Sequence, residues 1–156
     1  MRKIIICRGI QGSGKTTWAK QWVIEKPNER IRINNDDIRN MLGKYWVPER
    51  ESLVSQIRFN ILESAMFYGY DIVIDNMNLN DKEVDDIEIF VRTFNDEAYS
   101  EDTIGKHHYE IEFKNFLTPL DTCIERDSKR ADPIGEGVIR KTYEKYKDKL
   151  YSLQTT

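Results

Sequence analysis

The chain has 156 residues, 39% of them hydrophobic and 33% charged, which indicates one globular domain with its own hydrophobic core. The sequence has no apolar run long enough to cross a membrane. Its two cysteines lack a CxxC motif, so we expect neither a disulfide framework nor a metal site built on cysteines. This use of cysteine fits a reducing, cytoplasmic location. The formal net charge of −3 argues against a protein that coats long stretches of nucleic acid, because such proteins usually present a basic face.

Short apolar runs alternate along the chain with segments that carry apolar residues at helical spacing. The predicted strands are residues 2–7, 30–34, 71–75 and 108–113. The predicted helices are residues 15–26, 37–42, 49–68, 81–94, 119–130 and 137–151, with Asn80 capping the fourth of them and a polar loop over 95–106. This alternation predicts a single three-layer α/β domain, residues 1–156, in which helices cover both faces of a parallel sheet of about four strands. Its ligands are expected beyond the carboxyl ends of the strands.

The segment GIQGSGKT, residues 9–16, satisfies the phosphate-binding pattern GxxxxGK[ST] between the first predicted strand and the first predicted helix. The glycines allow backbone N–H groups to turn toward phosphate oxygens, and the helix directs the positive end of its dipole at them. Lys15 then reaches the β- and γ-phosphates of ATP or GTP, while the Thr16 hydroxyl ligates Mg²⁺. A dinucleotide-binding loop fits less well, since Thr17 occupies a slot that needs glycine or alanine. The residues predicted to bind the donor are Gly9, Gln11, Gly12, Ser13, Gly14, Lys15, Thr16 and Thr17.

The segment NNDDIRN, residues 34–40, directly follows the second predicted strand. Asp36 is placed at the carboxyl edge of the sheet, where a carboxylate can accept the proton of an attacking hydroxyl, and Asp37 is expected to support the start of the next helix. Arg39 can hold an acceptor phosphate with two hydrogen bonds. The alternative is that the segment only caps a short helix. In the following loop, Trp46 is predicted either to stack on a base of the acceptor or to cover the core.

The segment DIVIDNMN, residues 71–78, reads as an apolar strand that ends in Asp75. A carboxylate in that position is typical of a Walker B strand, in which it orients Mg²⁺. Asn76 and Asn78 could contact phosphate or the acceptor. The alternative is a buried strand followed by polar turn residues without a binding role.

Two arginines, Arg126 and Arg130, are spaced one helical turn apart in the segment IERDSKRADP. Their positive charge suits a transferring phosphoryl group, so residues 126–137 are predicted to form a helical lid that binds the donor and excludes water. The alternative is an exposed helix end whose basic residues favour the helix dipole. The helix before the lid is predicted to start with a capping box over residues 118–121.

The order of these motifs resembles the kinase domain of bacteriophage-type polynucleotide 5′-hydroxyl kinases over nearly the whole chain. The matching segments are GSGKTTWA, INNDDIR, NLN, RDSKR and the following PI. The resemblance implies a P-loop kinase fold and transfer of the γ-phosphate of ATP, with Mg²⁺, to the 5′-hydroxyl end of DNA or RNA. It implies Asp36 as general base, Arg39 on the 3′-phosphate of the acceptor, Lys15 on the donor phosphates, and Arg126 and Arg130 on the donor nucleotide and the transferring phosphate.

Two residues depart from that family pattern on the acceptor side. Asn35 stands in place of an arginine, and Met77 in place of a threonine. The DxDGT motif of a phosphatase domain is absent, so no phosphatase domain is expected.

Two other functions stay open on the sequence alone. The first is a P-loop kinase that acts on another hydroxyl, such as a hydroxymethylated base in phage DNA, a nucleoside or a small metabolite. The second is a nucleotide-binding switch protein, although a switch needs neither the DDxxR nor the RxxxR segment. The sequence suggests no membrane association and no obligate protein partner, and it is consistent with the host cytoplasm if a phage encodes the protein.

Overall fold

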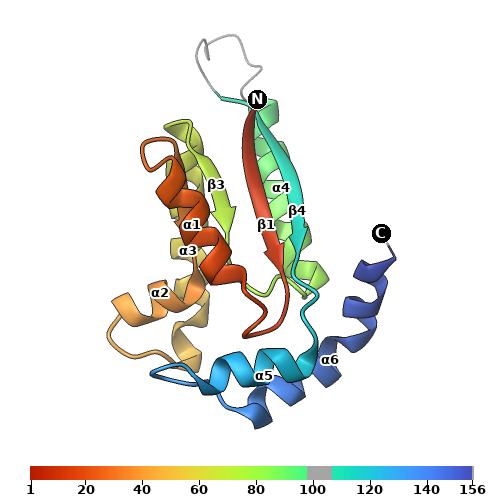
Figure 1. Ribbon diagram of the computed structural model, residues 1–156. Coiled ribbons are helices and arrows are strands. Elements are labelled where there is room, and N and C mark those ends of the chain that lie inside the picture. The colour runs from red at the N-terminus through yellow and green to blue at the C-terminus, as the bar shows by residue number, and fades with distance from the viewer. Residues whose placement is uncertain (98–106, 156) are drawn as a thin grey trace.

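A computed structural model describes residues 1–97 and 107–155 of the protein, and its elements follow the predicted alternation of strands and helices (Figure 1). The strands are β1 (Arg2–Arg8), β2 (Arg30–Ile33), β3 (Asp71–Ile74) and β4 (Tyr109–Asn115). The helices are α1 (Lys15–Glu25), α2 (Asn35–Met41), α3 (Glu51–Phe67), α4 (Asp81–Glu97), α5 (Leu120–Ser128) and α6 (Glu136–Gln154), with a short 3-10 helix η1 (Pro48–Arg50) before α3. Residues 95–97 of the predicted polar loop are instead the last residues of α4, and residues 98–106 lie outside the described residues.

The sheet has the order β2-β3-β1-β4, and all three strand pairs are parallel, as predicted. Parallel strands bring their carboxyl ends to one edge, so the segments after β1, β2 and β3 are gathered there. Within the described ranges, no helix combines the length and the apolar content needed to span a bilayer.

Alternate residues of the strands pack against opposite layers of helices, which confirms the three-layer prediction. Ile4 and Ile6 of β1 belong to the cluster that α3 and α4 cover, while Ile5 and Cys7 belong to the cluster that α1 covers. A third cluster joins α5 and α6 to the loop after β1, and these two helices lie across the carboxyl end of the sheet (Figure 1). The functional segments therefore lie between the sheet edge and these two helices.

Side-chain caps explain where two of the helices begin. The Asn34 side chain accepts a hydrogen bond of 2.9 Å from the Asp37 backbone N–H, so α2 begins at Asn35, two residues before its predicted start. The predicted cap of α4 is confirmed, because Asn80 Oδ1 accepts a hydrogen bond of 3.0 Å from the Lys82 backbone N–H.

The predicted capping box of α5 is wrong. The residue before the helix is Pro119, and α5 has no side-chain cap. The Thr118 hydroxyl instead donates a 2.8 Å hydrogen bond to the Ser13 carbonyl oxygen, which lies far away in the sequence. A tertiary contact with the glycine-rich loop thus replaces the local one.

Candidate functional site

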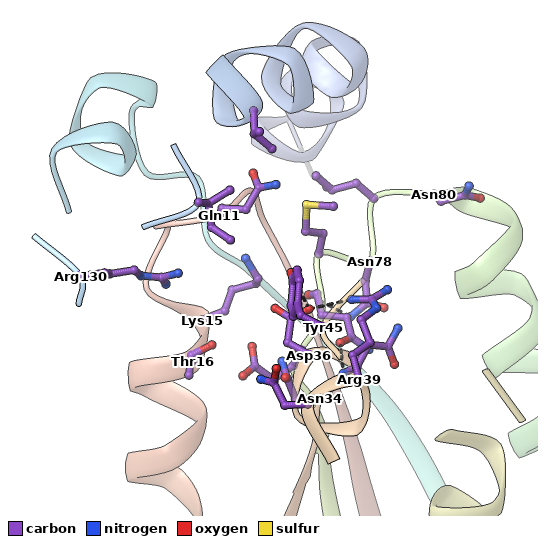
Figure 2. A pocket seen from close by; sticks show the side chains of 18 of the residues that line it. Gln11, Lys15, Thr16, Asn34, Asp36, Arg39, Tyr45, Asn78, Asn80 and Arg130 are labelled. Carbon is purple, nitrogen blue, oxygen red and sulfur yellow. Dashed lines mark hydrogen bonds and ion pairs between the residues drawn. The ribbon is translucent and has the colours of Figure 1, made fainter. Parts of the chain in front are cut away.

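A pocket of about 710 Å³ opens at the carboxyl edge of the sheet (Figure 2). Its wall consists of the glycine-rich loop and the start of α1, the segment from the end of β2 through α2, the segment after β3, and the connection between α5 and α6. Of the residues singled out from the sequence, the pocket is lined by Gln11, Lys15, Thr16, Asp36, Arg39, Asp75, Asn76, Asn78 and Arg130. The pocket therefore brings together residues predicted for the donor and for the acceptor.

The glycine-rich loop takes a backbone shape that its glycines permit. Gly12 and Gly14 have φ angles of 76° and 102°, in the left-handed region that favours glycine. A Cβ atom at Gly12 would collide with the Cys123 carbonyl oxygen of α5. Gly14 caps α1, so the positive end of the helix and the first side chains of α1 are directed at the pocket.

Lys15 is the buried cation of this loop, with only 8% of its surface exposed. Its Nζ donates hydrogen bonds to the carbonyl oxygens of Gly9 at 2.8 Å and Ile10 at 2.7 Å, and to Ser13 Oγ at 3.3 Å. Burial lowers the pKa of Lys15 to about 8, while the negative charge of Asp75 opposes this shift. A phosphate that replaced these carbonyl contacts would bring a full negative charge to a poorly solvated ammonium group.

Asp36 and Arg39 lie together on the opposite side of the pocket from Lys15 (Figure 2). Arg39 Nη1 donates to Asp36 Oδ1 at 2.7 Å, and the Tyr45 hydroxyl donates to the same oxygen at 3.1 Å. Both hydrogen bonds that Asp36 accepts within the described residues fall on Oδ1, which leaves Oδ2 for a proton from a substrate. Asp36 and Arg39 thus lie at the predicted edge, and Tyr45, rather than Trp46, lines the pocket with them.

Glu51, at the start of α3, is a residue of this cluster that sequence reasoning missed. Its Oε1 and Oε2 accept hydrogen bonds from Arg39 Nη2 at 2.5 Å and Nε at 3.1 Å. These contacts and the bond to Asp36 hold the Arg39 guanidinium and raise the pKa of Arg39. In the sequence, an acidic residue at the start of a helix is typical of a favourable helix-dipole contact, and no spacing links it to Arg39.

Asp75 lies directly after β3, as predicted, and is almost wholly buried. Its Oδ2 accepts a 2.7 Å hydrogen bond from Arg32 Nε, and Arg32 Nη1 also pairs with Asp37 Oδ2 at 2.5 Å. Asp37 therefore contributes to an ion-pair chain, while the cap of α2 comes from Asn34. Asp75 Oδ1 is buried and has no hydrogen-bond partner within the described residues.

This free oxygen and the Thr16 side chain in the same pocket fit a Mg²⁺ ion that takes its other ligands from phosphate and water. Across residues 1–97 and 107–155, no three His, Cys, Asp or Glu side chains come together in an arrangement that could hold a metal ion.

Asn76 and Asn78, both predicted as acceptor contacts, differ in how much of each side chain the fold uses. Asn78 Nδ2 donates to the carbonyl oxygens of Cys7 at 2.7 Å, Ile74 at 3.3 Å and Asn76 at 3.2 Å, and its φ of 51° is left-handed. This amide nitrogen therefore connects the end of β1 to the end of β3 by hydrogen bonds. Asn76 uses only its Oδ1, which accepts from the Asn35 backbone N–H at 2.8 Å.

The two predicted lid arginines have different surroundings. Arg130 lines the pocket and lies 3.9 Å from the buried carboxylate of Asp127. The Asp127 carboxylate accepts hydrogen bonds from the backbone N–H groups of Ile134 at 3.0 Å and Gly135 at 2.9 Å. These bonds hold the connection between α5 and α6 in place. Arg126, in the last turn of α5, is not among the pocket-lining residues, but its guanidinium lies beside the glycine-rich loop at Gly14.

Trp46 is 53% exposed and belongs to none of the hydrophobic clusters of the described residues. Its ring centroid lies 5.6 Å from the Arg39 guanidinium carbon. The interpretation that Trp46 covers the core is therefore wrong, and the interpretation that it stacks on an acceptor stays a prediction.

Comparisons with known proteins agree with this architecture. The putative bifunctional polynucleotide kinase/RNA ligase of Autographa californica nuclear polyhedrosis virus is 25% identical over 162 aligned residues, which cover 93% of this chain and 21% of the viral protein. This relative bears out the resemblance that the motifs indicate. Two solved structures of the Pnkp1/Rnl/Hen1 complex share the fold, one with a TM-score of 0.73 and 23% identity, the other with 0.63 and 24%.

These structural matches cover 99% and 80% of this chain, respectively, and the chain spans less than half of each matched chain, 46% and 38%. The family model of the AAA domain matches residues 4–153, nearly the full sequence. The chain belongs to the AAA domain family.

Proposed function

We propose that the protein is a phosphotransferase that moves the γ-phosphate of ATP to the 5′-hydroxyl end of a polynucleotide. The observation that carries this proposal is the shared pocket, in which Lys15 and Thr16 of the glycine-rich loop lie across from the pair formed by Asp36 and Arg39. The viral relative is described as a putative polynucleotide kinase, and this supports the choice of acceptor.

In the proposed reaction, the backbone N–H groups of the loop and Lys15 hold the β- and γ-phosphates. The 5′-hydroxyl oxygen of the acceptor forms a bond to the γ-phosphorus as the bond to the bridging oxygen of the β-phosphate breaks. The proton of the hydroxyl moves to Asp36, whose Oδ2 is left open by the two donors on Oδ1. Thr16 and Asp75 are the residues that would hold a Mg²⁺ ion, which would neutralise charge on the phosphates.

Arg39 is the residue proposed to hold the 3′-phosphate of the first nucleotide. A guanidinium group has five N–H donors, and the three hydrogen bonds to Glu51 and Asp36 leave two of them. These two N–H groups can donate to two different phosphate oxygens or to the same one. Arg126 and Arg130 are proposed to bind the donor and the transferring phosphate from the α5 side.

A second candidate, a kinase of a small hydroxyl compound, is favoured by the charges around the pocket. The pocket-lining cations are Lys15, Arg39 and Arg130, and the pocket-lining anions are Asp36, Asp75, Glu83 and Asp132. Because Lys15 and Arg130 are assigned to the donor, Arg39 is the pocket-lining cation left to bind an acceptor phosphate. A single phosphate contact suits a short acceptor as well as a long one. Both solved relatives are complexes with other proteins, so independence from a protein partner stays a prediction.

The test is transfer of label from γ-labelled ATP to a panel of 5′-hydroxyl oligonucleotides, nucleosides with and without a 3′-phosphate, and modified duplexes. The proposal expects oligonucleotides and nucleoside 3′-phosphates to be labelled far better than bare nucleosides, with no label in the folded Lys15→Ala variant. Labelling of bare nucleosides as strong as that of oligonucleotides would favour the small-molecule kinase. No labelling of any acceptor would refute the kinase proposal and favour a nucleotide-binding switch.

A further inference from the structure

Several buried polar atoms in the wall of the pocket have no hydrogen-bond partner within the described residues. They are Gln11 Oε1, Asn35 Oδ1, Asp75 Oδ1 and Asn76 Nδ2. Buried polar groups are nearly always paired, and an unpaired one costs about 1–3 kcal/mol. Of the two oxygens on the donor side, Asp75 Oδ1 fits the Mg²⁺ site described above, and Gln11 Oε1 belongs to the glycine-rich loop. The pair from Asn35 and Asn76 has no use in the reaction described above.

Asn35 and Asn76 are held together by the fold. The Asn35 backbone N–H donates to Asn76 Oδ1 at 2.8 Å, and this bond assigns the unpaired end of the Asn76 amide as its nitrogen. The pair therefore has one unpaired acceptor, Asn35 Oδ1, and one unpaired donor, Asn76 Nδ2, on two residues that line the pocket. A hydroxyl group is the common ligand that satisfies both, because it donates one hydrogen bond and accepts another.

The place of this pair relative to the reacting groups identifies the hydroxyl. Asn35 precedes Asp36, which faces the 5′-hydroxyl in the proposed function, and it lies one helical turn before Arg39 on the same face of α2. Arg39 is assigned to the 3′-phosphate, and the 2′-carbon of a nucleotide is bonded to the 3′-carbon. A group beside Arg39 is therefore nearer to the 2′-position of the sugar than to the base.

We propose that Asn35 and Asn76 bind the 2′-hydroxyl of the 5′-terminal ribose, so that the protein prefers RNA ends to DNA ends. The 2′-hydroxyl donates to Asn35 Oδ1 and accepts from Asn76 Nδ2. A 2′-deoxyribose leaves both buried amide atoms unpaired, and this loss is what discriminates between the sugars. This inference rests on the proposed function and names the acceptor more closely.

The experiment compares two oligonucleotides that are identical except for the sugar of the 5′-terminal nucleotide, ribose or 2′-deoxyribose, with each of the four bases at that position. For the wild-type protein we expect kcat/KM to be about 10- to 100-fold higher for the ribose end with every base, which corresponds to one or two lost hydrogen bonds. The Asn35→Ala variant, which keeps the backbone bond to Asn76, is expected to lower kcat/KM for the ribose end and to reduce the preference to within about 3-fold. The KM for ATP is expected to stay unchanged.

Two further variants sharpen the comparison. Asn76→Ala should reduce the preference as Asn35→Ala does, and thermal unfolding checks that the start of α2 survives the loss of the Asn35–Asn76 bond. Asn60→Ala, a matched change on an exposed part of α3 outside this pocket, should keep the full preference.

Equal kcat/KM for the two sugars in the wild-type protein would overturn the inference while leaving the proposed kinase intact. A preference that follows the base instead of the sugar, or an equal loss on both sugars in Asn35→Ala, would overturn it as well. Failure to label any 5′-hydroxyl end would instead refute the proposed function itself.

Discussion

Glu51 holds Arg39 by two hydrogen bonds, from Nη2 at 2.5 Å and from Nε at 3.1 Å, across the junction of α2 and α3. One edge of the guanidinium is therefore committed to the protein, and the opposite edge has a fixed direction. A phosphate-binding arginine that is oriented in advance loses less conformational entropy when it binds.

The first prediction concerns this orientation. Glu51→Gln should raise KM for an acceptor with a 3′-phosphate by about 10-fold, because a neutral amide holds the guanidinium less firmly. The KM for ATP should not change, and a bare nucleoside should be affected much less than its 3′-phosphate. Steady-state kinetics with both acceptors checks this, with Glu49→Gln on the neighbouring exposed side chain as the control. An equal change for both acceptors would contradict an effect through Arg39.

The second prediction separates the two adjacent aspartates. Asp36→Asn should lower kcat by about 10²-fold or more, the usual scale for a lost general base. Asp37→Asn removes one partner of Arg32, which keeps its bond to Asp75, so kcat should change little. The measurement is single-turnover transfer from labelled ATP by each folded variant. Equal, small effects would mean that the segment only caps α2.

The third prediction concerns Lys15 and pH. In the unfolded chain its pKa is the ordinary 10.5, and in the folded protein burial lowers it to about 8. Between these values the unfolded chain binds more protons than the folded protein, so the contribution of Lys15 to the free energy of unfolding rises with pH. Below about pH 8 the lysine is charged in both states, and its contribution is constant.

Urea unfolding of the wild type and of Lys15→Met at pH 7 to 10 checks this third prediction. The wild type should gain stability relative to the variant as the pH rises through that window. A difference between the two proteins that stays constant across the range would contradict the buried, charged environment of Lys15.

The fourth prediction concerns the arginines of the α5 side. Arg126→Ala and Arg130→Ala should each lower kcat about 10-fold or more, and lysine at either position should not restore it, because a lysine lacks the planar fork of donors. Arg126 lies beside Gly14, so its variants should also raise the KM for ATP. Arg140→Ala, an exposed change on α6, serves as the control for stability and rate. Wild-type rates in both alanine variants would contradict this prediction and favour the alternative, in which the two arginines only interact with the dipole at the end of the helix.

The fifth prediction concerns Asp127, which accepts two backbone N–H groups of the connection between α5 and α6. Asp127→Ala should cost about 1–3 kcal/mol of stability, because the two N–H groups lose their buried partner. Trypsin should then cleave faster after Lys129 or Arg130, which the connection holds in place. The change Asp121→Ala, at the exposed start of α5, is the matched control, and equal cleavage rates in both variants would contradict the prediction.

Features with a local cause were predictable from the sequence. The strands follow from apolar runs, and the phosphate-binding loop follows from its glycines and Lys15. The presence of Lys15 and Asp36 in one pocket also follows, because all strands of a parallel sheet present their carboxyl ends at one edge.

Contacts that depend on how helices pack were not predictable. The ion pair of Arg39 with Glu51 needs the relative placement of α2 and α3, and the bond of Arg32 to Asp75 needs two strands that are distant in the sequence to be neighbours. The predicted capping box of α5 was wrong for a related reason. Its sequence pattern is that of a local cap, but the Thr118 hydroxyl donates to the Ser13 carbonyl oxygen instead. In each case a tertiary partner decided the outcome.

The contacts between α5 and the glycine-rich loop have a consequence for how such a protein can be redesigned. The Thr118 hydroxyl is hydrogen-bonded to the Ser13 carbonyl oxygen, and a side chain at Gly12 would collide with the Cys123 backbone. A residue inserted between β4 and α5 would therefore distort the donor side directly. The turn at Gly43 has nothing within 4 Å of where a side chain would begin. Changes of length there can alter the acceptor side while the donor side is kept, which makes the loop before α3 the place to graft a new acceptor specificity.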